Sequence, residues 1–315
     1  MLAARVARRL AWSAGVLLAV AVIVFVLTYL VPVDPARTVA GPHAPPEAIA
    51  RIRSALGLDR PLLAQLTEYI GRLAGGDLGY SYARGTAVLP LIIERLPATL
   101  QLAFAGLLVE VAIGLPLGVV GARRRGAPAG RVSTLLSVIL VAAPAFWVGY
   151  LLLYLVAFLP TVRLGIDVFP VGGGYRPLDL RYLLLPALTL GLSGAGTCAR
   201  LTAVALTDEL GRDYVRTARA KGVSERVAAW RHAMRNAVGP VVSQLGLDLG
   251  FFVGGVVVVE TVFSWPGIGQ LAVEAIEAND VPLVMGTVLV GAVGIVGANI
   301  LVDIAQTLLD PRLRV

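Results

Sequence analysis

The sequence predicts an all-α integral membrane protein with six transmembrane helices. Of the 315 residues, 57% are hydrophobic and only 15% are charged, against about 25% charged in a typical soluble domain. Six apolar runs follow one another along the chain, each of roughly the 20 residues needed to cross a ~30 Å hydrocarbon core. This composition excludes disordered and fibrous proteins, and it argues against a soluble enzyme.

The six expected spans are nearly free of charged residues. They cover 10–33, 100–122, 132–159, 182–206, 238–262 and 283–309. The first run is longer than the roughly 7–15 apolar residues of a signal peptide, so we expect a retained helix. Pro116, Pro144 and Pro186 lie inside spans, where neighbouring helices can satisfy the freed backbone groups.

The basic residues predict the orientation. They cluster before the first expected span, between the second and third, between the fourth and fifth, and after the sixth. With six spans these four segments share one side, which the positive-inside rule makes the cytoplasmic side. Both termini are then expected in the cytoplasm. The net charge of +7 reflects this asymmetry, so the lipid bilayer is an expected partner and nucleic acid is not.

The chain divides into four expected segments. They are an N-terminal segment with the first span (1–33), an extracytoplasmic region (34–97), a transmembrane core (98–309) and a cytoplasmic tail (310–315). Within the core, 208–239 is the longest cytoplasmic connection and the least hydrophobic. The length and polarity of this connection exceed what is needed only to link two spans, so we examine it for a further role.

The connection 208–239 predicts two short helices joined by a tight turn. The composition of 213–221 favours a helix, and Gly222 can adopt the left-handed conformation that ends one. Ser224 is a suitable N-cap, and Glu225 is well placed in the first turn of a second helix over 225–237. A docking site for a cytosolic partner is one interpretation, and a basic loop that only fixes topology is the other.

The second helix has apolar residues at helical spacing. Val227, Trp230, Met234 and Val238 follow an i, i+3, i+7, i+11 pattern. We expect Trp230 and Met234 to pack this helix, which leads directly into the fifth span and would act as a rigid lever.

The same connection resembles the EAA loop of permease subunits in binding-protein-dependent ABC importers, in the variant of dipeptide, oligopeptide and nickel permeases. The similar stretches are 213–222 (DYVRTARAKG), 231–237 (RHAMRNA) with Pro240, 56–61 (LGLDRP), 76–79 (GDLG), 94–99 (ERLPAT), 259–267 (VETVFSWPG) and 309–312 (LDPR). Arg216 and Arg235 depart from the general EAA pattern in the way common in the peptide branch. Asp248 stands where that branch usually has an uncharged polar residue.

The resemblance implies a permease subunit that forms half of a translocation pathway for peptides or related small solutes in the bacterial cytoplasmic membrane. The implied partners are a second homologous permease, identical or different, two cytosolic ATP-binding subunits and an extracytoplasmic solute-binding protein. Because the chain has no GxxxxGK[ST] loop, ATP and Mg²⁺ are expected in the ATPase subunits. No cofactor, metal or catalytic residue is expected in this chain. Nickel chelates, glutathione and other small solutes remain alternative substrates.

Three groups of candidate residues follow. The resemblance assigns these to the ATPase-coupling loop: Asp213, Arg216, Ala218, Lys221, Gly222, Ser224, Glu225, Trp230, Arg231, Arg235 and Asn236. Glu110 and Asp248 are candidates for the translocation pathway, because carboxyl groups within spans usually face a bundle interior or a water-filled cavity. Glu260, Trp265 and Pro266 are candidates for the outer mouth, with an interfacial anchor as the alternative for the tryptophan.

The sequence argues against two other classes of membrane protein. The stretch 191–194 (GLSG) has the form of an intramembrane serine protease nucleophile, but that chemistry needs a histidine base, and His43 and His232 both lie outside the spans. A stand-alone channel or secondary transporter needs no docking loop, and no internal repeat is visible.

Overall fold

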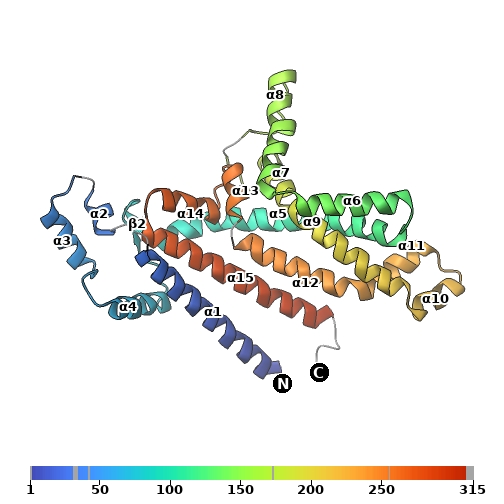
Figure 1. The fold of residues 1–315 in the computed structure, drawn as a ribbon, viewed down its shortest axis with the longest axis horizontal. Coiled ribbons are helices and arrows are strands. Elements are labelled where there is room, and N and C mark those ends of the chain that lie inside the picture. The colour runs from blue at the N-terminus through green and yellow to red at the C-terminus, as the bar shows by residue number, and fades with distance from the viewer. Residues whose placement is uncertain (1, 31–34, 42, 172–173, 255, 310–315) are drawn as a thin grey trace. The chain divides into compact units, whose positions relative to one another are not determined.

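The computed structural model describes the whole chain except residues 1, 31–34, 42, 172–173, 255 and 310–315. The expected cytoplasmic tail (310–315) and the junction at 33 and 34 lie outside the described residues. The chain forms two compact units, 1–99 with 266–296 and 100–265 with 297–315. Helices make up almost all of both units (Figure 1), so the all-α class is confirmed.

The first unit contains α1, the short elements that follow it, and the beginnings of two long helices. Its elements are α1 (Leu2–Leu30), α2 (Pro35–Ala40), α3 (Pro46–Ala55), α4 (Leu62–Ala74), β1 (Tyr80–Ser81), β2 (Thr86–Ala87), the start of α5 (Val88–Arg123), α14 (Ile268–Glu277) and the start of α15 (Val281–Leu309). β1 and β2 pair antiparallel, with Ser81 opposite Thr86.

One apolar cluster of the first unit joins α1, α4 and α15. α4 is amphipathic, and Leu66, Tyr69 and Leu73 recur along one face at helical spacing. The Tyr69 ring stacks on Phe25 with 5.6 Å between ring centroids, and Met285 belongs to the same buried cluster. This packing fixes α4 against the ends of two apolar helices.

A second cluster joins the start of α5 to α14 and α15. Its buried members are Val88, Ile92, Ile268, Leu271, Ala275 and Leu283. Polar contacts hold the β-hairpin beside this cluster: Ser81 donates a buried hydrogen bond to Asp280, and Arg84 Nη2 lies 2.6 Å from Glu274 Oε2. The hairpin is therefore attached to the helices by side chains as well as by the chain itself.

The second unit is built around α9. Its elements are the rest of α5, α6 (Pro128–Ala142), α7 (Ala145–Leu152), the π-helical η1 (Leu153–Phe158), α8 (Leu159–Leu164), α9 (Leu180–Leu210), α10 (Asp213–Ala220), α11 (Glu225–Val227), the π-helical η2 (Ala228–Ala233), α12 (Met234–Val253), α13 (Val257–Val262) and the end of α15. α9 packs against α6, α7, α12 and α13, and it is the most buried of the long apolar helices.

Glycines let the helices of the second unit approach one another closely. A Cβ at Gly118 of α5 would lie 2.5 Å from the Ala199 carbonyl oxygen of α9. A Cβ at Gly246 of α12 would lie 2.0 Å from a methyl carbon of Val302 on α15. Such small-residue contacts are typical of helix packing in membranes.

Five helical segments of the described residues are long and apolar enough to cross a membrane. They are Ala11–Thr28, Val88–Arg123, Ala145–Leu164, Leu180–Leu210 and Val281–Val302. α12, which carries most of the fifth expected span, is not among them, and it ends at Val253 instead of reaching 262. Its polar residues Ser243, Gln244 and Asp248 lower its hydropathy.

The third expected span, 132–159, is not one helix. α6 ends at Ala142 and α7 begins at Ala145, with Pro144 extended between them (ψ 134°). The prediction of a single span containing Pro144 was therefore wrong. Proline lacks the N–H that would continue the helix and disfavours helical geometry in the residue before it. α6 and α7 consequently run in different directions (Figure 1).

Candidate functional site

The first candidate site is built on α10, which follows directly after α9. Asp213 lies in its first turn, where a carboxylate is favourable at the positive end of the helix dipole. Val215 and Ala218 are buried, and Val215 belongs to an apolar cluster with residues of α5, α9 and α12. Arg216 lies on the exposed side, with Nη1 3.4 Å from Asp213 Oδ1. One face of α10 therefore packs against the rest of the second unit, and the opposite face is exposed to solvent.

The turn after α10 has the geometry of a helix C-cap. Gly222 has φ +84°, its N–H donates to the Arg219 carbonyl at 2.9 Å, and Lys221 is the capping residue. No atom lies within 4 Å of where a Gly222 Cβ would be, so only the backbone conformation requires glycine here. Ser224 Oγ then accepts a hydrogen bond from the Val227 N–H at 3.5 Å and caps α11.

An ion pair that sequence reasoning missed closes this turn. Arg219 Nη2 donates to Glu225 Oε2 at 3.0 Å, and its Nε lies 2.8 Å from Glu225 Oε1. Arg219 Nη1 also donates to the Leu210 carbonyl at 3.4 Å. Glu225 was a candidate residue, but its partner was not. The sequence does contain a signal for this ion pair, because Arg219 and Glu225 flank Gly222, the glycine that ends α10.

The second helix continues without a break through α11, η2 and α12. Its buried residues in this region are mostly alanines: Ala228, Ala229, Ala233, Met234 and Ala237. Met234 is packed as predicted, but Trp230 is 42% exposed, so the prediction that Trp230 packs the helix was wrong. Val227, which precedes η2, is also 42% exposed, so the buried face is formed by the neighbouring alanines and not by the predicted apolar stripe. Arg231 and Arg235 are also exposed.

A hydrogen-bonded chain ties the second helix back to α10. Asn236 Nδ2 donates to Tyr214 Oη at 3.0 Å, and Tyr214 donates to Glu209 Oε2. Partial burial and the bond to Glu209 raise the pKa of Tyr214, so the phenol remains a donor at neutral pH. Asn236 was a candidate residue from the sequence, whereas Tyr214 and Glu209 were not.

The second candidate site is a pair of carboxyl groups inside the second unit. Glu110 of α5 is fully buried, and its carboxyl carbon would lie 2.5 Å from a Cβ at Gly194 of α9. Asp248 of α12 is half-buried, and Gln244 Nε2 donates to its two carboxyl oxygens at 3.0 and 3.1 Å. Glu110 and Asp248 lie close enough to interact electrostatically.

The carboxyl pair joins three helices at one place. Neither oxygen of Glu110 has a hydrogen-bond partner among the described residues, and glycine at position 194 leaves the space that its carboxyl group fills. The described residues contain no group of three side chains suited to hold a metal ion. Glu110 and Asp248, the two pathway candidates, are therefore neighbours in the fold. The sequence did not reveal this, because more than one hundred residues separate them along the chain.

The outer-mouth candidates lie inside the protein. Glu260 and Trp265 are each 1% exposed, and the Trp265 N–H donates to the Glu260 carbonyl at 2.8 Å. The Tyr175 ring meets Trp265 edge-on at 5.2 Å. Pro266 is half-buried. Trp265 thus packs against protein, and the role of these residues at an outer mouth stays a prediction.

These features describe a multi-span membrane protein with a folded polar connection, and comparisons with known proteins define its family. Residues 114–315 match the family described as binding-protein-dependent transport system inner membrane component, and residues 1–103 match its N-terminal family. The chain belongs to this family: it is a permease subunit of an ABC importer of the peptide and oligopeptide group, and a multi-pass protein of the bacterial inner membrane.

Named relatives extend along the whole chain. The glutathione transport system permease protein GsiC of Salmonella choleraesuis (strain SC-B67) is 38% identical, covering 98% of each chain. A putative peptide transport system permease protein of Brucella melitensis is 40% identical, covering 100% of this chain and 99% of its own length. The GsiC protein of Escherichia coli (strain K12) is 37% identical.

Solved structures show the same fold. The MetNI methionine ABC transporter in an inward-facing conformation matches with a TM-score of 0.56 at 19% identity, covering 70% of this chain and 96% of that chain. An amino acid ABC transporter matches with a TM-score of 0.51 at 16% identity, covering 71% and 94%. These likenesses concern the fold, and the family match and the named relatives confirm the expected protein class.

Proposed function

We propose that this subunit forms half of an ATP-driven pathway for peptides, including small peptides such as glutathione, with Asp248 contacting the substrate's ammonium group. The observation that carries this proposal is the carboxyl pair between α5, α9 and α12. Asp248 retains some exposure, whereas Glu110 is buried behind it. The names of the relatives, a glutathione permease and a putative peptide permease, support the same substrate class.

Within this pair the two carboxyl groups have different roles. An isolated buried carboxylate is costly in a membrane interior, and two neighbouring carboxylates disfavour full ionisation. Glu110 and Asp248 together therefore favour a cationic partner at this place. Glu110 acts as a positioning residue, and Asp248 pairs with the ammonium group that peptides and glutathione carry. Gln244 orients Asp248 by donating to both of its oxygens.

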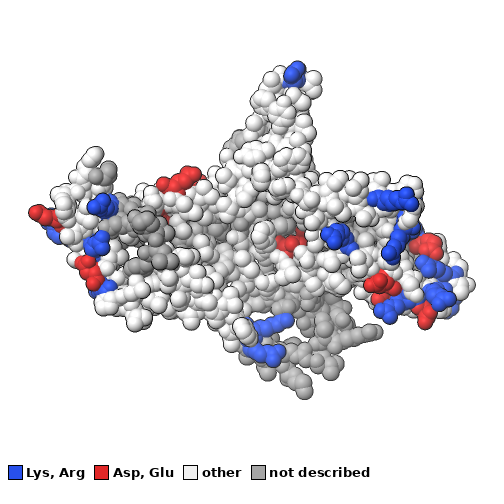
Figure 2. All heavy atoms as spheres, viewed as in Figure 1, with Lys and Arg blue, Asp and Glu red and all other residues white. Residues whose placement is uncertain are grey.

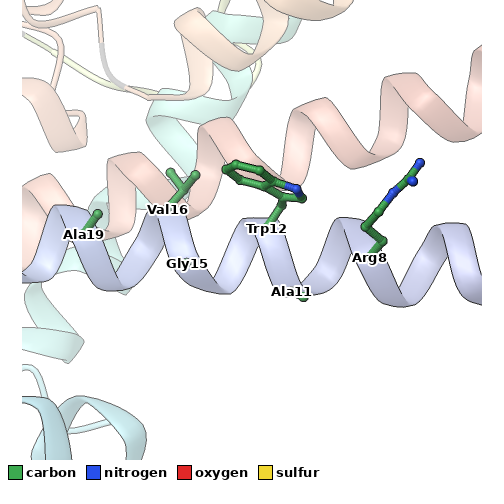
Figure 3. A pocket seen from close by; sticks show the side chains of 6 residues that line it. All are labelled: Arg8, Ala11, Trp12, Gly15, Val16 and Ala19. Atoms are coloured by element: carbon green, nitrogen blue, oxygen red, sulfur yellow. The ribbon is translucent and has the colours of Figure 1, made fainter.

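The proposed topology has six spans, with α12 as the sixth spanning helix in addition to the five long apolar segments. In the second unit, Lys and Arg side chains gather at the end that carries α10 and α11 (Figure 2). In the first unit, Arg8 and Trp12 project from the same part of α1, at the start of its apolar segment (Figure 3). Tryptophan is typical of either membrane interface, and basic residues at a span end are typical of the cytoplasmic one. Both termini are then cytoplasmic.

The proposed coupling element for the ATPase is the segment α10–α11–η2 together with the first turn of α12, which carries Arg235 and Asn236. Its inner face is anchored by buried alanines and by Asn236, while its outer face presents exposed basic and aromatic side chains. These exposed side chains are Arg216, Lys221, Arg226, Trp230, Arg231 and Arg235. A basic, rigid helix of this kind fits a groove that carries acidic groups. Because η2 is continuous with α12, movement of the segment would be passed to Asp248.

The proposed assembly contains this permease, a second homologous permease, two ATP-binding subunits that hold ATP and Mg²⁺, and an extracytoplasmic solute-binding protein. Uptake by the purified assembly in proteoliposomes tests the proposal. Labelled dipeptide, glutathione and nickel-chelate are supplied in separate reactions, with and without internal ATP. ATP-dependent uptake of dipeptide or glutathione supports it. Uptake confined to nickel-chelate refutes the substrate class, and uptake without ATP indicates a channel.

A further inference from the structure

A cavity of about 610 Å³ lies within the first unit, away from both candidate sites. Its lining comes from α1, the start of α2, α3, α4, the turns that follow α3 and α4, the β-hairpin and the start of α15. This volume falls within the range of small-molecule binding pockets, about 300–1,000 Å³. The cavity therefore has room for a ligand and not merely for one or two waters.

The cavity lies where two apolar segments end. Phe25 and Thr28 come from the last turns of the apolar segment of α1, and Val281 and Met285 come from the first turns of α15. Where a membrane-spanning helix ends, hydrocarbon gives way to lipid headgroups. The apolar part of the lining therefore lies at the hydrocarbon boundary, and the remaining part lies at headgroup level or beyond.

The polar part of the lining contains a buried donor without an acceptor. Tyr69 is only 8% exposed, its ring is fixed by stacking on Phe25, and its hydroxyl has no hydrogen-bond partner among the described residues. Buried hydroxyls are rarely left unpaired in native proteins. Burial raises the pKa of Tyr69 to about 12, so the phenol remains a hydrogen-bond donor at physiological pH.

The lining contains two positive and two negative side chains, and one of the positive ones, Arg72, lies near the Tyr69 hydroxyl without an ion-pair partner among the described residues. Arg53 and Arg72 contribute positive charge, and Glu68 and Asp77 contribute negative charge. Glu68 is paired with Arg60 at 3.0 Å, and Asp77 accepts a backbone N–H from its own turn. Arg72 lies one helical turn from Tyr69, interacts electrostatically with its phenol, and forms no ion pair with any described residue. A ligand entering here meets the exposed guanidinium of Arg72, one helical turn from the buried Tyr69 hydroxyl.

We propose that this cavity binds an amphipathic anion, in which an acidic headgroup meets Tyr69 and Arg72 and a hydrocarbon chain lies along Phe25 and Met285. A carboxylate or phosphate accepts the Tyr69 hydrogen bond and pairs with the guanidinium of Arg72. The chain extends toward the hydrocarbon boundary. The two sources of this chemistry are a free fatty acid and an anionic phospholipid of the surrounding membrane.

Photo-crosslinking of the full-length protein in membrane vesicles tests the proposal. One sample receives a diazirine-bearing fatty acid, a second a diazirine-bearing phosphatidylglycerol, and a third the matching uncharged fatty alcohol. After irradiation, mass spectrometry maps the labelled peptides. We expect at least one acidic probe to label the stretches around Phe25 and Met285, with the alcohol giving about tenfold less. If only the fatty acid labels these stretches, the ligand is a free fatty acid. If the phosphatidylglycerol labels them, the ligand is a phospholipid of the membrane.

Two variants remove the proposed headgroup contacts. Tyr69→Phe keeps the stacked ring and removes only the hydroxyl, and Arg72→Gln removes an exposed charge. Each is expected to lower labelling roughly tenfold, as loss of a charge-assisted hydrogen bond implies. Arg51→Gln and Tyr154→Phe, neither of which lines the cavity or pairs with a residue that does, are matched controls that keep full labelling. Equal labelling of the two cavity variants and the native protein, or equal labelling by the alcohol, overturns the proposal.

Discussion

Replacement of Gly222 gives the sharpest test of the coupling element. Gly222 has φ +84°, and nothing lies within 4 Å of a Cβ built at this position. A substitution therefore changes only the backbone preference of the turn and creates no steric clash. The left-handed conformation costs a non-glycine residue about 1–2 kcal/mol, which corresponds to a roughly five- to thirtyfold change in the population of the native turn. Asparagine tolerates this conformation better than alanine, and valine tolerates it worst.

The series Gly222→Asn, Gly222→Ala and Gly222→Val should therefore uncouple transport progressively. Membrane insertion stays intact, because the turn lies outside every apolar segment. The measurement is the number of solute molecules taken up per ATP hydrolysed in proteoliposomes that contain the whole assembly. We expect a near-native ratio for asparagine, a lower ratio for alanine and the lowest for valine.

A matched control separates backbone strain in general from strain in this turn. Gly126, in the connection between α5 and α6, has φ +86° and also has no atom within 4 Å of a built Cβ. Gly126→Val introduces the same strain in another basic loop and should leave the coupling ratio unchanged. Native coupling in Gly222→Val, or equal loss in Gly126→Val, would show that the turn does not transmit the motion.

Three further predictions concern the second unit. Asp248→Asn should raise the KM of uptake about tenfold for peptides with a free amino terminus and should leave the KM of N-acetylated peptides unchanged. If the substitution changes the KM of both substrates equally, or of neither, the ammonium contact is refuted. Gly246→Ala should destabilise the protein by about 1–3 kcal/mol, because its Cβ would lie 2.0 Å from Val302. Thermal unfolding should show partial recovery in the double variant with Val302→Ala, which removes the methyl carbons at 2.0 and 2.4 Å but keeps the Val302 Cβ at 2.7 Å, and lack of any recovery contradicts the contact. Asn236→Ala and Tyr214→Phe should each lower stability by about 0.5–1.5 kcal/mol, and a double-mutant cycle should show less than additive effects.

Much of the helical architecture followed from composition and span length, because an apolar run in a bilayer has few alternatives to a helix. The expected first, second, fourth and sixth spans each coincide with a long apolar helix. The third failed at Pro144, where sequence alone does not distinguish a kink from a break. The end of α12 at Val253 was also missed, since apolar residues continue beyond it.

In the candidate sites, local signals were more informative than long-range ones. Gly222 and Ser224 adopt the turn and cap conformations that their residue types favour. The exposure of Trp230 was missed because the buried face of this helix consists mainly of alanines, which a search for large apolar residues at helical spacing passes over. The meeting of Glu110 with Asp248 depends on how distant helices pack, and no local pattern specifies that packing.

We expect the exposed face of the α10–α11–η2 segment to contact the ATPase subunit. A photo-crosslinking amino acid placed at position 231, where Arg231 is exposed, tests this directly in the intact, transporting assembly. The same substitution at Arg163, exposed on α8, is the control. We predict a crosslink to the ATPase from position 231 and none from position 163. An assembly that transports normally but gives no ATPase crosslink from position 231 would contradict the claim.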